Sequence, residues 1–273
     1  MKKIIAALIL PLFLAGIVVM TSNTSCKNRK EQKKIEIEQA DTIVGQIEKN
    51  VYPLPTSADV IRMLTDLEVG YIFGISNPVE NSKKYIKSVD RAINLGGYGA
   101  DLSYATLYNM QQEVLNYLSA LRSLANELNM SQIYDETWYE KIRQNYDNRD
   151  ELVRILTEAF QKTYAYLIDN NQETLALLVV GGAWVEGMYL TTHVSEAAYQ
   201  VAGISRNLLE QKESFETYLE ITKPYSEDPD IKAFLDILQP IKKVYEGLTT
   251  SLTQQNIIDI TKAIEGIRAQ IIK

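Results

Sequence analysis

Two stretches of the sequence place a carboxylate and a tyrosine at the same spacing behind a pair of glycines. Asp101 and Tyr104 follow the first pair as Glu186 and Tyr189 follow the second. Residues three positions apart lie on one face of a helix, so each carboxylate has a phenol as its neighbour. Paired carboxyl groups can act as general acid and base, and with aromatic rings they can line a site for a small cationic or polar ligand.

The candidate site extends to a nearby indole and to the single histidine of the chain. The full candidate set is Asp101, Tyr104, Trp184, Glu186, Tyr189 and His193. Glu186 stands inside an almost wholly apolar run, 179–190, and a buried carboxylate needs a partner. The alternative to a ligand site is therefore a structural carboxylate, held by a tyrosine hydroxyl, an arginine or a helix N-terminus.

An enzyme or metal-binding protein that uses an acidic cleft around Asp101, Glu186 and His193 is the alternative function. Nothing in the sequence fixes the separation of the two carboxylates, on which acid–base catalysis depends. One histidine and two carboxylates make a poor metal set, because di-iron helical bundles use two Glu-x-x-His motifs. The glycines also lack the spacing of a phosphate-binding loop. We therefore expect no catalytic residue set, no metal and no cofactor.

The glycines need a structural reason, because a glycine inside a helix costs roughly 1 kcal/mol relative to alanine. One reason is a helix break at which glycine adopts positive φ, and the other is the close approach of two helices. We predict a break at 96–99, with Asp101 near the start of the next helix, where its charge suits the helix dipole. The second stretch is apolar almost throughout, which favours a continuous buried helix.

The two glycine stretches align at an offset of 85 residues (181 − 96). A second pair of similar segments, 59–66 and 151–158, aligns at an offset of 92 (151 − 59). A loop can absorb the difference. These matches predict an internal duplication with pseudo-repeats at about 56–130 and 148–222, followed by C-terminal helices at 229–272. Chance similarity between amphipathic helices is the alternative.

Composition and periodicity predict an all-α fold, a helical bundle or array of helical hairpins. The chain is 46% hydrophobic and has only 13 Gly and 7 Pro in 273 residues. Apolar residues recur every three or four positions, and no stretch alternates like a strand. We predict one all-helical domain over 35–273. Asn148 and Thr253 are predicted helix N-caps, Asp228 precedes a helix start, and Pro240 is predicted to kink that helix.

The N-terminus has the layout of a bacterial lipoprotein signal. Two lysines precede an apolar run, 4–20, and small polar residues lead to Cys26, the only cysteine. We predict removal of 1–25, lipidation of Cys26 and a basic tether over 26–34. An uncleaved membrane anchor is the alternative, because an apolar run of this length stands at the lower edge of a membrane span.

Charge is distributed unevenly along the chain. The net charge is −7, but residues 1–34 hold seven bases and one acid, which leaves 28 − 7 = 21 bases and 35 − 1 = 34 acids, a net charge of −13, for 35–273. A domain this acidic repels phosphate backbones, so nucleic acid is excluded as an expected partner. With no cysteine after Cys26, disulfides and thiol chemistry are excluded as well.

The chain resembles secreted helical lipoproteins of unknown function from Bacteroidota in two segments, 99–105 (Gly-Ala-Asp-Leu-Ser-Tyr-Ala) and 24–26 (Thr-Ser-Cys). The resemblance implies a diderm envelope and lipid attachment at Cys26, and it carries no catalytic residue. Basic rather than acidic residues follow Cys26, which favours the periplasmic side of the outer membrane. We therefore expect a lipid-anchored, non-enzymatic cell-envelope protein that binds an envelope protein or a small polar ligand.

Overall fold

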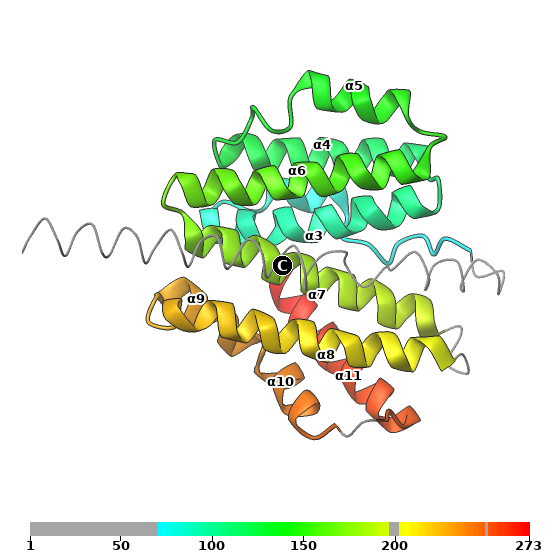
Figure 1. Ribbon diagram of the computed structural model, residues 1–273, viewed down its shortest axis with the longest axis vertical. Helices are drawn as coiled ribbons and strands as arrows, with labels where there is room; N and C mark the ends of the chain where they lie inside the picture. Colours follow the sequence, from blue (N-terminus) through cyan, green and yellow to red (C-terminus); the bar gives the residue numbers. More distant parts are fainter. Residues whose placement is uncertain (1–69, 197–201, 249–250) are drawn as a thin grey trace, which may run out of the picture. The chain divides into compact units, whose positions relative to one another are not determined.

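The computed structural model describes residues 70–196, 202–248 and 251–273, all of which belong to one compact unit of the chain (Figure 1). These ranges contain α-helices and two short 3₁₀ turns but no strand, which confirms the all-α prediction. The predicted signal peptide, Cys26, the tether and segment 59–66 lie outside the described residues. The helices are α3 (Ser88–Leu107), α4 (Gln111–Glu127), α5 (Glu136–Gln144), α6 (Arg149–Asp169), α7 (Glu173–Glu196), α8 (Ala202–Thr222), α9 (Pro229–Ile237), α10 (Gln239–Glu246) and α11 (Gln254–Ile271).

Helix α7 is the central element of the described part. It packs most extensively on α3, and it also contacts α6, α8, α9 and α11. In Figure 1 it lies between α3, α4 and α6 on one side and α8 to α11 on the other. The stretch Glu173–His193 is long and apolar enough to cross a membrane, and 83% of its most apolar window is buried inside the protein. Burial on all sides explains why this helix lacks a polar face.

Helices α3 and α7 cross with their backbones in direct contact. A Cβ atom on Gly96 would overlap the carbonyl oxygen of Val179, and one on Gly182 would overlap the carbonyl oxygen of Ile93. Both glycines are therefore required by close approach, because any side chain at these positions would push the two helices apart. The predicted continuity of the second glycine stretch is confirmed, since α7 runs through it unbroken.

The predicted helix break at 96–99 is wrong. Helix α3 passes through all three glycines of that segment, so Asp101 lies inside the helix and not at its start. The break falls at 108–110, where Asn109 adopts the left-handed conformation with φ 54°. Asparagine tolerates this region better than most residues. Of the three glycines in 96–99, Gly96 is the one that the packing against α7 requires.

The α3–α7 crossing is symmetric, but in a different register from the sequence alignment. Gly96 of α3 meets Val179 of α7, and Gly182 of α7 meets Ile93 of α3. This exchange pairs Gly96 with Gly182 and Ile93 with Val179, an offset of 86 residues (182 − 96 and 179 − 93), whereas the alignment used 85. In the register of the contacts Asp101 corresponds to Gly187 and not to Glu186. The internal duplication is not confirmed by this geometry.

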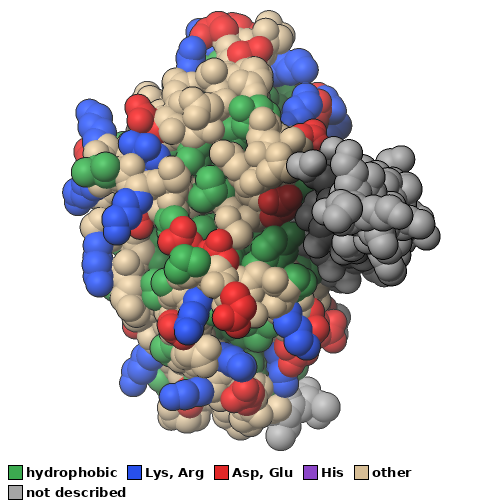
Figure 2. Space-filling view, turned by 90° about the vertical axis from the view of Figure 1, so that its left-hand side faces the viewer, with side chains coloured by type: hydrophobic (Ala, Val, Ile, Leu, Met, Phe, Trp, Pro, Cys, Tyr) green, Lys and Arg blue, Asp and Glu red, His purple; other side chains and the backbone are tan. Residues whose placement is uncertain are grey.

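Side-chain caps define several helix ends as predicted. Asn148 accepts a hydrogen bond from the Glu151 N–H at the start of α6, and Thr253 and Asn256 form a capping box on α11. Asp228 caps α9, and the helical run is interrupted at Leu238, just before Pro240. On the face in Figure 2, acidic and basic side chains are interspersed between small apolar areas.

Candidate functional site

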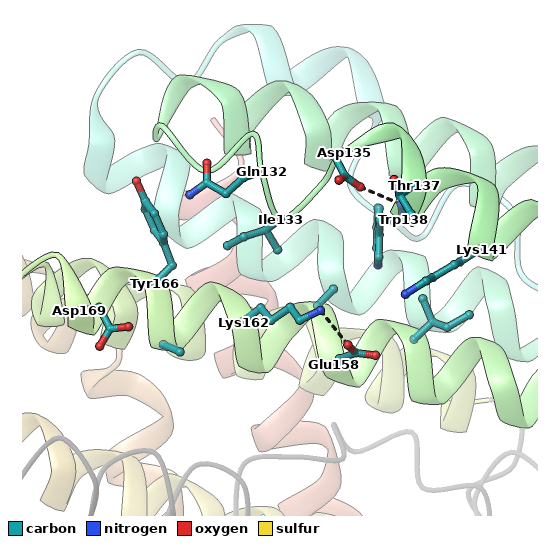
Figure 3. Close-up of a pocket in the computed structure, with 13 residues that line it drawn as sticks. Gln132, Ile133, Asp135, Thr137, Trp138, Lys141, Glu158, Lys162, Tyr166 and Asp169 are labelled. Carbon is teal, nitrogen blue, oxygen red and sulfur yellow. Dashed lines mark hydrogen bonds and ion pairs between the residues drawn. The ribbon is translucent and has the colours of Figure 1, made fainter.

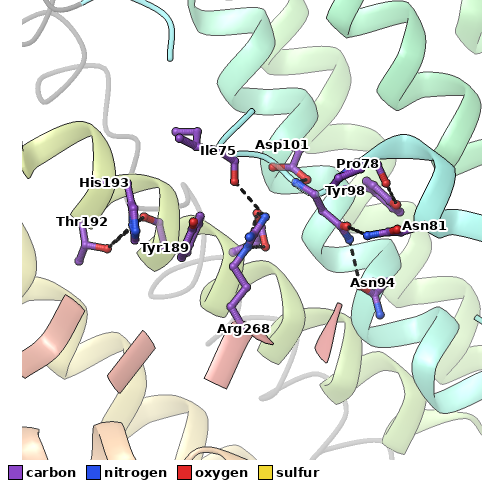
Figure 4. Close-up of polar contacts among 12 residues, drawn as sticks. Ile75, Pro78, Asn81, Asn94, Tyr98, Asp101, Tyr189, Thr192, His193 and Arg268 are labelled. Atoms are coloured by element: carbon purple, nitrogen blue, oxygen red, sulfur yellow. Dashed lines mark hydrogen bonds and ion pairs between the residues drawn. The ribbon is translucent and has the colours of Figure 1, made fainter. Parts of the chain in front are cut away.

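Asp101 and Glu186 meet beside the α3–α7 crossing, and an arginine from the C-terminal helix joins them. Arg268 donates from Nη2 to Glu186 Oε1 at 2.7 Å and from Nε to Oε2 at 2.8 Å. Its Nη2 also donates to the carbonyl oxygen of Ile75 at 3.0 Å (Figure 4). Only 8% of the Arg268 side chain and 4% of the Glu186 side chain are exposed, so this is a buried, bidentate ion pair.

Asp101 is a second carboxyl group beside the same guanidinium, and it is fully buried. The backbone N–H of Asn77 donates to its Oδ2 at 3.2 Å, while Oδ1 has no hydrogen-bond partner among the described residues. Burial raises the pKa of Asp101 well above its usual value, and the negative charge of Glu186 adds to this, against the opposing effect of Arg268. One cation and two carboxyl groups form a neutral cluster when Asp101 holds a proton.

Residues 70–87, here called the covering segment, close the cluster from one side. The side chain of Asn77 donates to Tyr85 Oη at 3.0 Å and to Asn94 Oδ1 at 3.3 Å, and it accepts from Asn81 Nδ2 at 2.8 Å. Tyr98 on α3 donates to a backbone carbonyl of the segment at 2.7 Å. These bonds attach an irregular segment to α3 through side chains that are themselves buried.

Tyr189 and His193 continue the cluster towards the surface. The Arg268 guanidinium carbon lies 3.9 Å from the centre of the Tyr189 ring, a cation–π contact. The His193 ring packs against the Tyr189 ring at a tilt of 31°, with 3.8 Å between their centres. His193 Nε2 lies 3.2 Å from Glu265 Oε1, which is half exposed. Figure 4 shows the side chains in this order.

Tyr104 and Trp184 do not join the cluster. The Tyr104 hydroxyl accepts from the Ile72 N–H at 3.0 Å, and its ring stacks on Tyr71 with 4.7 Å between centres. Trp184 lies two positions before Glu186, about 200° around the helix, so the two side chains leave α7 on roughly opposite sides. Its ring packs on Phe215, 4.9 Å away between centres, in the apolar core. The six predicted residues therefore divide into one polar cluster and two separate aromatic contacts.

Arg268 is the member of the cluster that sequence reasoning missed. It follows Ile264 by four positions, so it lies on the isoleucine face of α11 that packs into the core. The sequence held one signal for it, a basic residue on an otherwise apolar helix face. Because a buried glutamate needs a cation, such a residue is a candidate partner for Glu186. Sequence reasoning named an arginine as one possible partner of Glu186 but could not say which.

The cluster has limited capacity for chemistry in the observed arrangement. Both oxygens of Glu186 accept from Arg268, and a proton taken up by this carboxylate would remove the charge that compensates the buried guanidinium, so the ion pair opposes a role as general base. Within the described ranges, no group of three His, Cys, Asp or Glu side chains is placed to hold a metal ion.

A pocket of about 490 Å³ opens elsewhere, between α5 with its preceding loop and α6 (Figure 3). This volume is within the usual range for small-molecule sites. Apolar side chains form its floor, and charged and polar side chains form its rim. The lining residues are Gln132, Ile133, Asp135, Thr137, Trp138, Lys141, Ile155, Glu158, Ala159, Lys162, Ala165, Tyr166 and Asp169.

The charged groups on the rim of this pocket are unequally engaged. Lys162 Nζ and Glu158 Oε1 form an ion pair at 2.7 Å, and Asp135 accepts from the Trp138 backbone N–H as the N-cap of α5. By contrast, the described residues provide no ion-pair or hydrogen-bond partner for the side chains of Lys141 and Asp169. The pocket therefore offers one cation and one anion to an incoming molecule.

Comparison with known proteins finds no family model, no curated protein and no solved structure that matches this chain.

Proposed function

We propose that this chain is a lipid-anchored cell-envelope protein whose helical domain binds a small polar ligand or a partner without transforming it. The observation that carries the proposal is the pocket between α5 and α6, which combines an apolar floor with charged groups that have no partner in the described part of the chain. Ligand sites generally have this composition, because apolar walls provide affinity and a few polar groups fix orientation. The sequence of the N-terminus, with Cys26 after an apolar run, supports the anchor.

The alternative, an enzyme or metal-binding protein built on Asp101, Glu186 and His193, has less support. Catalysis by Glu186 as a general base would neutralise one partner of a buried ion pair, which leaves the Arg268 charge uncompensated in an apolar interior. Binding in the pocket involves no such loss. We therefore assign binding to the pocket and a structural role to the cluster.

Native mass spectrometry of the protein purified gently from its host tests the binding proposal. We expect a reproducible extra mass on the wild type that disappears in Ala165→Trp, because Ala165 is exposed and lines the pocket, so an indole there fills the space. Gln161→Trp is the matched control, since Gln161 is exposed on the same helix but does not line the pocket. Equal extra mass on both variants would show that the ligand binds elsewhere.

Cell fractionation tests the anchor. The variant Cys26→Ala should leave the membrane fraction, because the thiol that carries the lipid is absent. Retention of that variant in membranes at full precursor length would establish the uncleaved anchor instead.

A further inference from the structure

The two unpaired charges of the α5–α6 pocket stand at opposite ends of it. The pKa of Glu158 is lowered mainly by Lys162 and less strongly by Lys141. The Lys141 ammonium therefore lies at the end of the pocket that Glu158 lines. Asp169 lines the other end, and Figure 3 shows Lys141 and Asp169 on opposite sides of the pocket. Glu158 and Asp169 are 11 positions apart on α6 (169 − 158), which corresponds to about 16 Å along the helix.

This distance restricts the kind of ligand that can satisfy both charges. The ammonium and carboxylate of a free amino acid lie only a few ångströms apart, so a single amino acid cannot reach Lys141 and Asp169 together. An extended peptide rises about 3.3 Å per residue, and about five residues therefore span 16 Å. A free peptide of that length carries its α-ammonium at one end and its α-carboxylate at the other, which matches the pocket.

The middle of the pocket suits the side chains of a short apolar peptide. Trp138, Ile133 and Ala159 line it and provide apolar contact for small side chains. In Figure 3 the Trp138 ring stands between the Lys141 end and the Asp169 end of the pocket.

We propose that the pocket binds a free peptide of about five residues in extended form, with its C-terminal carboxylate at Lys141 and its N-terminal ammonium at Asp169. The inference rests on the binding function proposed above and specifies its ligand class. Each terminal contact is an exposed ion pair, and such pairs contribute up to about 1 kcal/mol, or about a fivefold change in Kd.

Titration calorimetry of the full chain with three probes tests this assignment. The probes are Ala-Val-Ala-Val-Ala with free termini, the same peptide N-acetylated, and the same peptide C-amidated. We expect the free peptide to bind and each modified peptide to bind about fivefold more weakly. No binding of the free peptide, or equal binding of all three, would overturn the inference.

Two variants assign the ends. Lys141→Gln should weaken the free peptide about fivefold but leave the C-amidated peptide unaffected, because that probe lacks the charge that Lys141 binds. Asp169→Asn should show the same relation with the N-acetylated peptide. Arg143→Gln is the matched control, since Arg143 is exposed on α5 and does not line the pocket. Loss of affinity for the amidated peptide in Lys141→Gln would overturn the assignment.

The outcomes separate the two proposals. If the host-purified protein carries a mass that Ala165→Trp removes but the free peptide does not bind, the peptide assignment fails and the binding function stands. If neither the host-derived mass nor the peptide is found, both proposals fail.

Discussion

The buried cluster and the α5–α6 pocket hold charged side chains in opposite ways. In the cluster, Arg268 and Glu186 are almost wholly buried and satisfy each other, and the covering segment closes over them. In the pocket, Lys141 and Asp169 stand at an open rim without partners among the described residues. The difference shows that a conspicuous set of carboxylates and tyrosines can belong to the architecture, while the groups available to a ligand come from side chains that look like ordinary surface charges.

The largest expected effect comes from breaking the ion pair of the cluster. Arg268→Met removes the cation but keeps most of the side-chain volume, and it leaves Glu186 as a buried charge without a counterion. The free energy of unfolding should fall by about 3–5 kcal/mol, as measured by urea denaturation. The matched variant Arg154→Met changes an exposed arginine of α6, whose ion pair with Glu151 is screened by solvent, and should leave the free energy of unfolding nearly unchanged. Equal effects of the two variants would contradict a structural role for the cluster.

The next effect concerns the helix crossing on which the cluster depends. Gly182→Ala places a Cβ atom against the backbone of α3 and should lower the free energy of unfolding by about 1–3 kcal/mol. Gly99→Ala is the control, because a Cβ atom there meets nothing within 4 Å. That substitution should raise stability by up to about 1 kcal/mol, as expected for alanine inside a helix. A stable Gly182→Ala protein would show that α3 and α7 do not touch as described.

A pH-dependent effect is expected from the protonation of Asp101. Its pKa is raised in the folded state, so the folded protein binds a proton that the unfolded chain releases above pH 3.8, the ordinary value. This contribution to stability is fully present below that pH and is lost as the pH rises through the folded pKa. Asp101→Asn removes the dependence, and its stability relative to the wild type should increase between pH 4 and pH 8, by at most about 1.4 kcal/mol per pH unit. Parallel stability curves for the two proteins would show that Asp101 is ionised in the folded protein.

The smallest effect on stability is expected at the pocket. Lys141→Gln should change the free energy of unfolding by less than about 0.5 kcal/mol, because the side chain is exposed and has no ion-pair partner in the described ranges. Thermal denaturation in the absence of ligand measures this. A marked loss of stability would mean that Lys141, like Arg268, serves the architecture.

Local sequence signals predicted the helical fold well, because they act within a few residues. The apolar periodicity and the caps at Asn148 and Thr253 are confirmed. The helix that Pro240 was predicted to kink is divided into α9 and α10 at Leu238, two residues before the proline. The helix break was misplaced because glycine serves both chain reversal and close packing, and the sequence does not say which. Only the crossing with α7 shows that Gly96 serves the second purpose.

The site was harder to predict because its decisive contacts are distant in the sequence. Arg268 and Glu186 are separated by 82 positions, and no local pattern links them. One hypothesis from the sequence placed Asp101 and Glu186 in a common site, and the two carboxyl groups do lie in one cluster. Trp184 and Tyr104, which the same hypothesis included, lie outside it. The pocket was not predicted, because Lys141 and Asp169 line the same cavity only once α5 packs over α6.

The most direct test of the division between architecture and binding is native mass spectrometry of three host-purified proteins: wild type, Ala165→Trp and Asp101→Asn. We predict the same extra mass on the wild type and on Asp101→Asn, and its loss from Ala165→Trp. An extra mass that Asp101→Asn loses and Ala165→Trp keeps would contradict the account, because the ligand would then bind at the buried cluster and the pocket would be a surface feature without that function.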